Sequence, residues 1–138
     1  MNLLLRKRAE PGSLHATVTG PFTLDEAKRT FLEILEAIAQ HQIDKVLIDG
    51  REIEGEPTTI QRFIYGEFAA TATRTLGERV ALPKTPQFAY VLQEPVLDPM
   101  RFGETVAVNR GMHVKAFDDL EDAFRWLGVD DDTHKGAD

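Results

Sequence analysis

The spacing of apolar residues along the chain predicts five strands and four helices. Short apolar or alternating runs indicate strands at about 3–5, 14–18, 45–49, 87–92 and 113–117. Apolar residues at helical spacing indicate helices at about 24–41, 58–76, 99–108 and 118–127. The runs at 45–49 and 87–92 are continuously apolar, as in strands that are covered on both faces of a parallel sheet.

Turn and capping residues support these boundaries. Thr23 and Glu26 form a capping-box pattern before the first helix, and Asp98 stands before a proline in the expected first turn of the third. Gly77 is a candidate C-terminal stop for the second helix. The turn sequence of residues 10–13 predicts a β-hairpin between the first two strands.

The predicted order, ββαβαβαβα, favours an α/β fold: a single layered domain with a mixed five-stranded sheet and four helices. Parallel connections are expected to be right-handed, and the hairpin makes the first strand antiparallel. No internal repeat or long linker divides the chain, so the domain is expected to span residues 1–128. Residues 129–138 are expected to be an acidic, disordered tail.

Composition excludes several functions. The 138 residues include 23 acids, 16 bases, one serine and no cysteine, for a net charge of −7. Eight acids and two bases lie from Asp118 onward, so the rest is almost neutral and lacks the basic stripe that nucleic-acid binding requires. The absence of cysteine rules out disulfides and thiol chemistry. Ser13, in a Pro-Gly-Ser turn, has no nucleophile-elbow pattern.

The expected location is the cytoplasm, without integral membrane association. No apolar run approaches the roughly 18 residues of a membrane span. The first residues place an apolar run before the bases, which is the reverse of the order in a signal peptide.

Three segments together resemble one known family. They are the predicted third strand with its following loop (46–55), the approach to the fifth strand (109–117) and the last helix (121–127). In order and spacing they resemble the SpoIIAA-like branch of STAS domains over residues 1–128. The resemblance implies a mixed sheet with flanking helices, in bacterial regulatory modules that bind partner proteins. It also implies a likeness in shape to lipid-carrying CRAL-TRIO domains.

Anti-sigma-factor antagonists of this family have a phosphorylatable serine, in an Asp-Ser pair, where the helix after the central strand begins. The corresponding residues here read Glu56-Pro57-Thr58-Thr59-Ile60. A phosphate on Thr58 or Thr59 would meet the unpaired amides of a helix N-terminus, and Arg62 could pair with it. The alternative, which the spacing favours, is that Thr58 caps the helix and Gln61 completes a capping box.

The acids near the third strand have two interpretations as well. Asp49, Glu52, Glu54 and Glu56 could bind a hard metal ion, but alternating acids on a loop are more often a solvated surface. Asp49 is expected at the carboxyl edge of the sheet, where ligands of α/β folds bind; alternatively it pairs with Arg51 as a structural carboxylate. The four histidines lack metal-ligand spacing, and no nucleotide motif is present, so no cofactor is expected.

The second long helix has more large apolar residues than one face needs. Its stripe is predicted at Ile60, Phe63, Ile64, Phe68, Ala72 and Leu76. Phe63 is expected in the core or beside a pocket, and Tyr65, off the stripe, at an interface such as a homodimer contact. The leading hypothesis is a noncatalytic STAS-type module that binds a protein partner through residues 50–59 and the start of this helix. The alternative is a carrier or sensor of a small apolar or lipid-like ligand.

Overall fold

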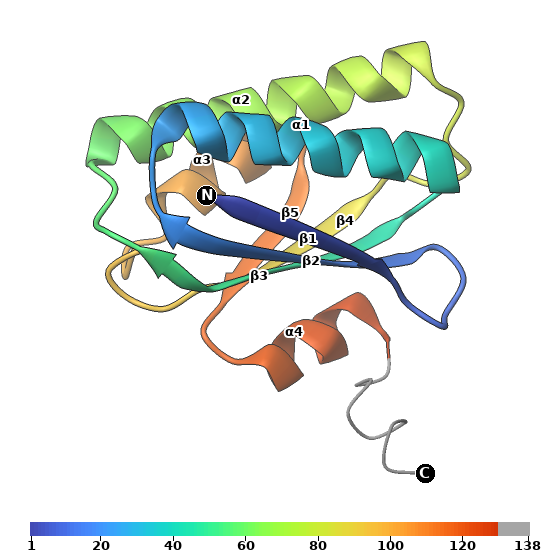
Figure 1. The fold of residues 1–138 in the computed structure, drawn as a ribbon. Helices are drawn as coiled ribbons and strands as arrows, with labels where there is room; N and C mark the ends of the chain where they lie inside the picture. Colours follow the sequence, from blue (N-terminus) through green and yellow to red (C-terminus); the bar gives the residue numbers. More distant parts are fainter. Residues whose placement is uncertain (130–138) are drawn as a thin grey trace, which may run out of the picture.

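The computed structural model describes residues 1–129 and has the predicted element order (Figure 1). The sequence thus forms one mixed five-stranded sheet with four helices, as expected. The elements are β1 (Asn2–Lys7), β2 (Ser13–Pro21), α1 (Leu24–His41), β3 (Lys45–Glu54), α2 (Thr59–Arg79), β4 (Gln87–Val91), α3 (Phe102–Asn109), β5 (His113–Phe117) and α4 (Leu120–Leu127).

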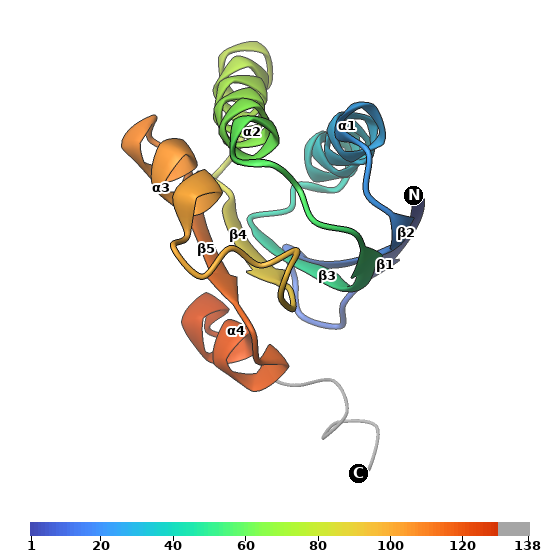
Figure 2. The ribbon, with the colours of Figure 1, turned by 90° about the vertical axis from the view of Figure 1, so that its left-hand side faces the viewer.

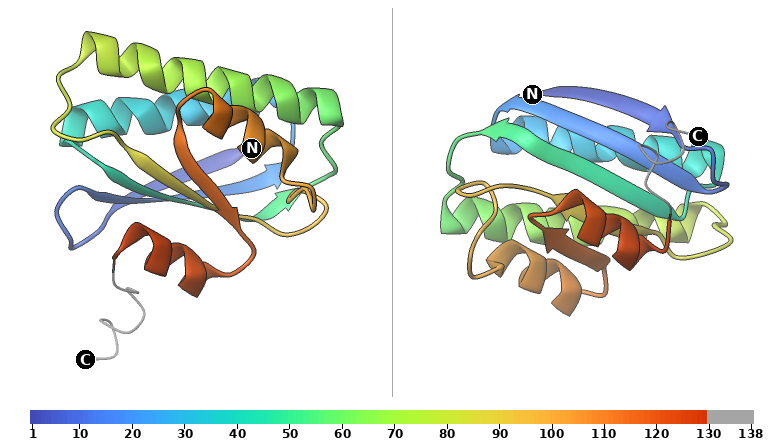
Figure 3. Two further views of the ribbon diagram at one scale, coloured as in Figure 1. Left: turned by 180° about the vertical axis from the view of Figure 1, so that it is seen from behind. Right: turned by 90° about the horizontal axis from the view of Figure 1, so that it is seen from below.

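The strands lie in chain order, β1-β2-β3-β4-β5, with β1 antiparallel to β2 and the other pairs parallel. Right-handed crossovers that always advance to the next strand place their helices on one face of the sheet. Accordingly, α1, α2 and α3 lie on one face, and α4, which follows the last strand, lies on the other (Figure 2). Seen from below, α4 lies toward β4 and β5, and β1 and β2 have no helix over them (Figure 3).

The main core lies between the sheet and the helices α1 and α2. Alternate residues of β2, such as Leu14 and Ala16, are buried there, as the period of two predicts. Phe31 of α1 packs against Phe88 of β4 with ring centroids 5.5 Å apart. A smaller apolar cluster on the opposite face joins β3 and β4 to α4 around Phe124.

Several predicted boundaries were wrong. β3 continues to Glu54, so half of the predicted 50–59 loop is strand that pairs with the end of β2. α2 does not stop at Gly77, because the backbone there stays helical, and it ends at Arg79. α3 begins at Phe102 rather than Pro99; Asp98 still accepts a hydrogen bond from the Phe102 amide, at 2.8 Å.

The buried face of α2 also differs from the prediction. Ile60 and Phe63 are 71% and 37% exposed, whereas Gly66, Ala69 and Ala70 are buried. The prediction followed the largest side chains, but α2 lies close against α3 and needs small residues there. A Cβ on Gly66 would lie 2.6 Å from the Gly103 carbonyl oxygen, so the close approach of the two helices requires glycine.

Side chains from the start of α3 bind the outer edge of the sheet. Arg101 donates a hydrogen bond to the carbonyl oxygen of Ala116 in β5, and Glu104 accepts one from the Ala116 amide. In a strand, the amide and the carbonyl of one residue point to the same side, and those of the next residue point to the opposite side. The Ala116 amide and carbonyl therefore both face away from β4. These two contacts fix α3 against the β5 edge.

The last helix begins two residues later than predicted, at Leu120 instead of Asp118. Asp119, rather than Asp118, is the N-cap of α4 and accepts a hydrogen bond from the Glu121 amide at 2.8 Å. The predicted acidic tail, apart from Val129, lies outside the described residues.

Candidate functional site

A cavity of about 160 Å³ lies between the sheet and the three helices of the same face. It is close to the carboxyl ends of β2, β3 and β4, and the first halves of α1 and α2 cover it. This is the edge at which α/β sheets commonly bind ligands. The residues that line it from these elements include Val18, Ala27, Thr30, Ile34, Ile48, Ile53, Arg62, Tyr65, Gly66, Ala69, Tyr90 and Ala107.

The cavity exists because small residues stand where α2 and α3 face the sheet. Gly66, Ala69 and Ala107 line it and fill little of the space that a leucine would occupy. The segment between β4 and α3 contributes Leu92, Val96 and Leu97, which close one side. The wall is therefore mostly apolar, as is typical of pockets for small organic ligands.

Most of the polar side chains in the wall bind protein atoms. Thr30 donates to the Ala27 carbonyl oxygen at 2.9 Å, and Gln61 accepts from the Thr58 amide at 2.8 Å. Arg62 donates to the carbonyl oxygens of Pro95 and Val96, each at 2.7 Å. The arginine predicted as a phosphate ligand therefore holds the segment that closes the cavity.

Tyr65 of α2 and Tyr90 of β4 meet in the cavity wall. Their hydroxyl oxygens are 2.6 Å apart, and their rings pack edge to face with centroids at 6.3 Å. Burial raises the pKa of Tyr65 to about 12, and burial together with its neighbour raises the pKa of Tyr90 well above its ordinary value. Tyr65, predicted at an outer interface, thus points inward, because the buried face of α2 is turned from the predicted one.

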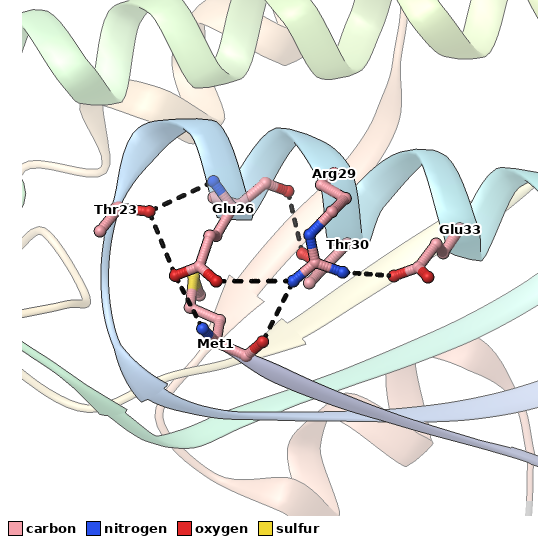
Figure 4. A network of polar contacts seen from close by, with 7 residues as sticks. Met1, Thr23, Glu26, Arg29, Thr30 and Glu33 are labelled. Atoms are coloured by element: carbon pink, nitrogen blue, oxygen red, sulfur yellow. Dashed lines mark hydrogen bonds and ion pairs between the residues drawn. The ribbon is translucent and has the colours of Figure 1, made fainter.

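Polar contacts at the start of α1 hold Met1, which also lines the cavity (Figure 4). The Met1 ammonium group is 2.8 Å from Glu26, whose amide in turn donates to the Thr23 side chain at 3.2 Å. Arg29 donates to the Met1 carbonyl oxygen at 3.2 Å and to Glu33 at 3.1 Å. These contacts connect the beginning of β1 to α1 beside the cavity.

Thr58 has the geometry of a helix cap. Its hydroxyl accepts a hydrogen bond from the Gln61 amide at 3.1 Å, and the Gln61 side chain returns one to the Thr58 amide. Both halves of the predicted capping box are therefore present. Thr59 is the exposed first residue of α2. Phosphorylation of either threonine stays a prediction. The Arg62 amide donates to the Thr58 carbonyl oxygen at 2.9 Å, but its guanidinium group is bound to the carbonyl oxygens of Pro95 and Val96.

Asp49 lies on the opposite face of the sheet from the cavity. It accepts hydrogen bonds from Nε and Nη2 of Arg51 at 2.9 and 2.8 Å, which is the predicted structural pairing. His15 of β2 places Nε2 3.9 Å from Asp49, and Arg6 of β1 donates to Nδ1 of His15 at 3.2 Å. Burial alone would raise the pKa of Asp49, but hydrogen bonds from His15 and Arg51 hold it well below its ordinary value.

His15 was not predicted as a partner of Asp49, because the two residues are far apart in the chain. The strand register brings them together: Thr17 pairs with Asp49, and His15 lies two residues earlier on the same face of β2. Residues 1–129 contain no group of three or more His, Asp or Glu side chains placed to hold a metal ion. None of the helices in this range has the length and apolar character needed to cross a membrane.

Comparison with known proteins gives matches in structure but not in sequence. No protein-family model and no curated protein matches the sequence. An anti-sigma factor antagonist from Mycobacterium paratuberculosis superposes with a TM-score of 0.55 at 14% identity, covering 92% of this chain and 93% of that one. The anti-sigma factor antagonist SpoIIAA in its unphosphorylated form gives 0.56 at 11% identity, covering 94% of this chain and all of that one.

A third solved structure, an uncharacterized protein with a SpoIIAA-like fold from Shewanella loihica PV-4, has a TM-score of 0.49 at 19% identity. It covers 91% of this chain and 92% of that one. The two antagonist structures match nearly the whole described chain and its element order. The chain therefore has the SpoIIAA-like STAS fold that its three sequence segments predicted.

Proposed function

We propose that this chain is a noncatalytic regulatory module that acts by binding a partner protein. The observation that carries the proposal is the fold, which it shares over nearly its whole length with two anti-sigma factor antagonists. The described residues also offer little for catalysis outside the cavity. Asp49 and His15 come nearest to forming an acid–base pair. Asp49 is bound to Arg51, however, and His15 to Arg6, on a face of the sheet.

The start of α2 is the surface that we propose for this contact. Ile60 is 71% exposed, and Phe63 is 37% exposed and stacks on Phe102 with centroids 6.3 Å apart. Glu56 and Thr59 beside them are also exposed. An exposed isoleucine next to an aromatic pair can contribute about 1 to 2 kcal/mol on burial, and the acids around it can select a partner with basic residues.

Substitution of Ile60 tests this surface. The I60E variant should lose the partner that the wild-type chain recovers from its native host in a cross-linked pull-down, because a carboxylate cannot enter an apolar contact. L32E is the matched control, since Leu32 is 49% exposed on α1 and lies outside the proposed surface. Recovery of the same partner by wild type and I60E, or its loss with both variants, would contradict the proposed surface.

The cavity favours a second candidate function, which is the sensing or carriage of a small apolar ligand. Its wall is mostly apolar and lies at the sheet edge where such ligands bind. Native mass spectrometry of freshly purified protein tests this function, because a copurifying ligand adds its own mass to the chain. Filling the cavity with the A69L substitution should remove that added mass while a substitution on the far face, such as D49N, should leave it.

A further inference from the structure

The volume of the cavity limits the size of its ligand. A comparable apolar cavity of about 150 Å³, engineered in another protein, binds one benzene molecule. The cavity described here has about 160 Å³. Pockets that enclose larger organic ligands have roughly 300 to 1,000 Å³. A ligand with about one six-membered ring fills this space, whereas most of a long acyl chain would have to lie outside it.

The hydrogen bonds of the wall limit the polar groups of the ligand. Thr30, Gln61, Arg62, Arg101 and Glu104 line the cavity, and each has a protein partner. A sixth polar side chain of the wall, Asp98, accepts hydrogen bonds from the amides of Met100 and Phe102. None of these side chains needs a ligand to satisfy its hydrogen bonding.

The tyrosine pair differs from these groups. Two hydroxyls carry two hydrogen atoms, and the contact between Tyr65 and Tyr90 uses one of them. Among the described residues, no hydrogen bond uses the other hydrogen. Because the contact is only part-buried and lies in the cavity wall, this hydrogen is free to be donated to an oxygen atom that enters the cavity beside it.

The electrostatics of the cavity favour a neutral ligand. Because burial raises the pKa of both tyrosines, the hydroxyls remain protonated and act as donors at neutral pH. The guanidinium groups of Arg62 and Arg101 are engaged with backbone carbonyl oxygens. A carboxylate would enter the apolar space without a free counter-charge, which is costly.

We propose that the cavity binds a neutral molecule the size of one ring, with one oxygen acceptor that takes a hydrogen bond from the Tyr65–Tyr90 pair. This inference rests on the second candidate function and adds the size, charge and polar group of the ligand. The apolar wall would hold the body of the molecule, and the hydroxyl pair would orient it. Neither the size limit nor the single polar contact fits carriage of a long-chain lipid.

Acetophenone and α-methylstyrene are suitable probes because they have the same shape and differ only in a carbonyl oxygen replaced by a methylene group. Dissociation constants are measured by NMR on protein labelled with ¹³Cζ-tyrosine, which gives only two signals because the chain has two tyrosines. In the Y65F/Y90F variant, the ratio of the two constants should shift about two- to tenfold toward α-methylstyrene, the value of one hydrogen bond. Because Y65F/Y90F contains no tyrosine and so has no ¹³Cζ signal, binding to this variant is followed through backbone amide signals.

The double variant should fold, because removing both partners of a hydrogen bond and keeping the ring shapes is nearly neutral. T73V is the matched control: it removes a hydroxyl of α2 that does not line the cavity, and it should leave the ratio unchanged. If Y65F/Y90F does not fold, the wild type alone provides the test. There acetophenone should move the ¹³Cζ signals, and α-methylstyrene should move them much less.

The outcomes separate this inference from the function on which it rests. If neither probe binds at millimolar concentration, both the ligand site and the inference are wrong. If both probes bind but their ratio is the same in wild type and Y65F/Y90F, the cavity is a ligand site and the proposed polar contact is wrong. Binding of benzoate as tight as that of acetophenone would overturn the neutral ligand, and displacement of the probes by palmitate would overturn the size limit.

Discussion

Replacing Gly66 by alanine tests whether the close packing of α2 on α3 is as strict as the structure indicates. A Cβ there would lie 2.6 Å from the Gly103 carbonyl oxygen and 3.4 Å from two side-chain carbons of Val106. Because the nearest of these atoms belongs to the backbone and cannot rotate away as a side chain can, the two helices must move apart. Overpacking of this kind costs about 1 to 3 kcal/mol, and alanine returns up to about 1 kcal/mol through its better helix propensity.

Gly77 provides the matched control in the same helix. A Cβ at Gly77 meets no atom within 4 Å, so the G77A variant keeps only the gain in helix propensity. G66A should therefore be less stable than G77A by about 1 to 3 kcal/mol, which is the cost of the clash alone. For a chain of this length that corresponds to roughly 3 to 5 °C in Tm for each kcal/mol.

Thermal and urea unfolding of the two variants, followed by circular dichroism, measure this difference. Both transitions should keep the wild-type m-value, because the same surface is exposed on unfolding. Equal stability of G66A and G77A would refute the reasoning, since it would mean that α3 can move away from α2 without loss of packing.

Three further predictions concern the polar groups. T58A should lower the free energy of unfolding by about 1 kcal/mol in urea titrations through loss of the N-cap, and T59A by much less. Since the pKa of Asp49 is lowered by folding, its contribution to stability is present above the unfolded value and is lost as the pH falls; D49N should therefore show a flatter acid limb than wild type in stability measured against pH. Tyr65 and Tyr90 should show little phenolate absorbance near 295 nm at pH 11 in folded protein, because the pKa of each is raised. The free energy of unfolding should therefore fall as the pH rises above the unfolded pKa of about 10. Phenolate absorbance at pH 10 without unfolding would contradict the buried pair.

The fold could be predicted from the sequence where local signals agree with the tertiary structure. The helix from Leu24 to His41 has a regular apolar stripe and the predicted N-cap, Thr23, although the Glu26 side chain binds the Met1 ammonium group instead of completing a capping box. Its predicted bounds are those observed. β5 was predicted with the observed ends, His113 and Phe117, because alternation of buried and exposed residues fixes a short strand. Strand order could not be predicted, since every order with right-handed crossovers is compatible with the same pattern of elements.

α2 shows why the site was harder to predict than the fold. The largest side chains, such as Phe63, were assigned to the core, but where α2 meets α3 there is room only for Gly66. Because the buried stripe was predicted on the wrong side of the helix, Tyr65 was expected to point outward, and its contact with Tyr90 was not predicted. The small residues 66, 69 and 70 were the available signal for the buried side of this helix.

The pairing of His15 with Asp49 was hidden for a different reason. It depends on which strands are neighbours and on their register, and a single sequence gives neither. The Asp49–Arg51 pair, two residues apart on one strand, could be predicted because both side chains lie on the same face. The cavity itself has no sequence signature, because it is the space that small residues on separate elements fail to fill.

The contacts of Arg101 and Glu104 with the Ala116 backbone have a consequence for self-association. An uncovered border of a sheet invites a strand from another molecule, and addition at both borders produces open-ended fibres. Here the Ala116 amide and carbonyl already have partners within the molecule. The occupied Ala116 groups therefore disfavour strand addition at β5 relative to β1, and pairing of two β1 borders would join two molecules without building a fibre.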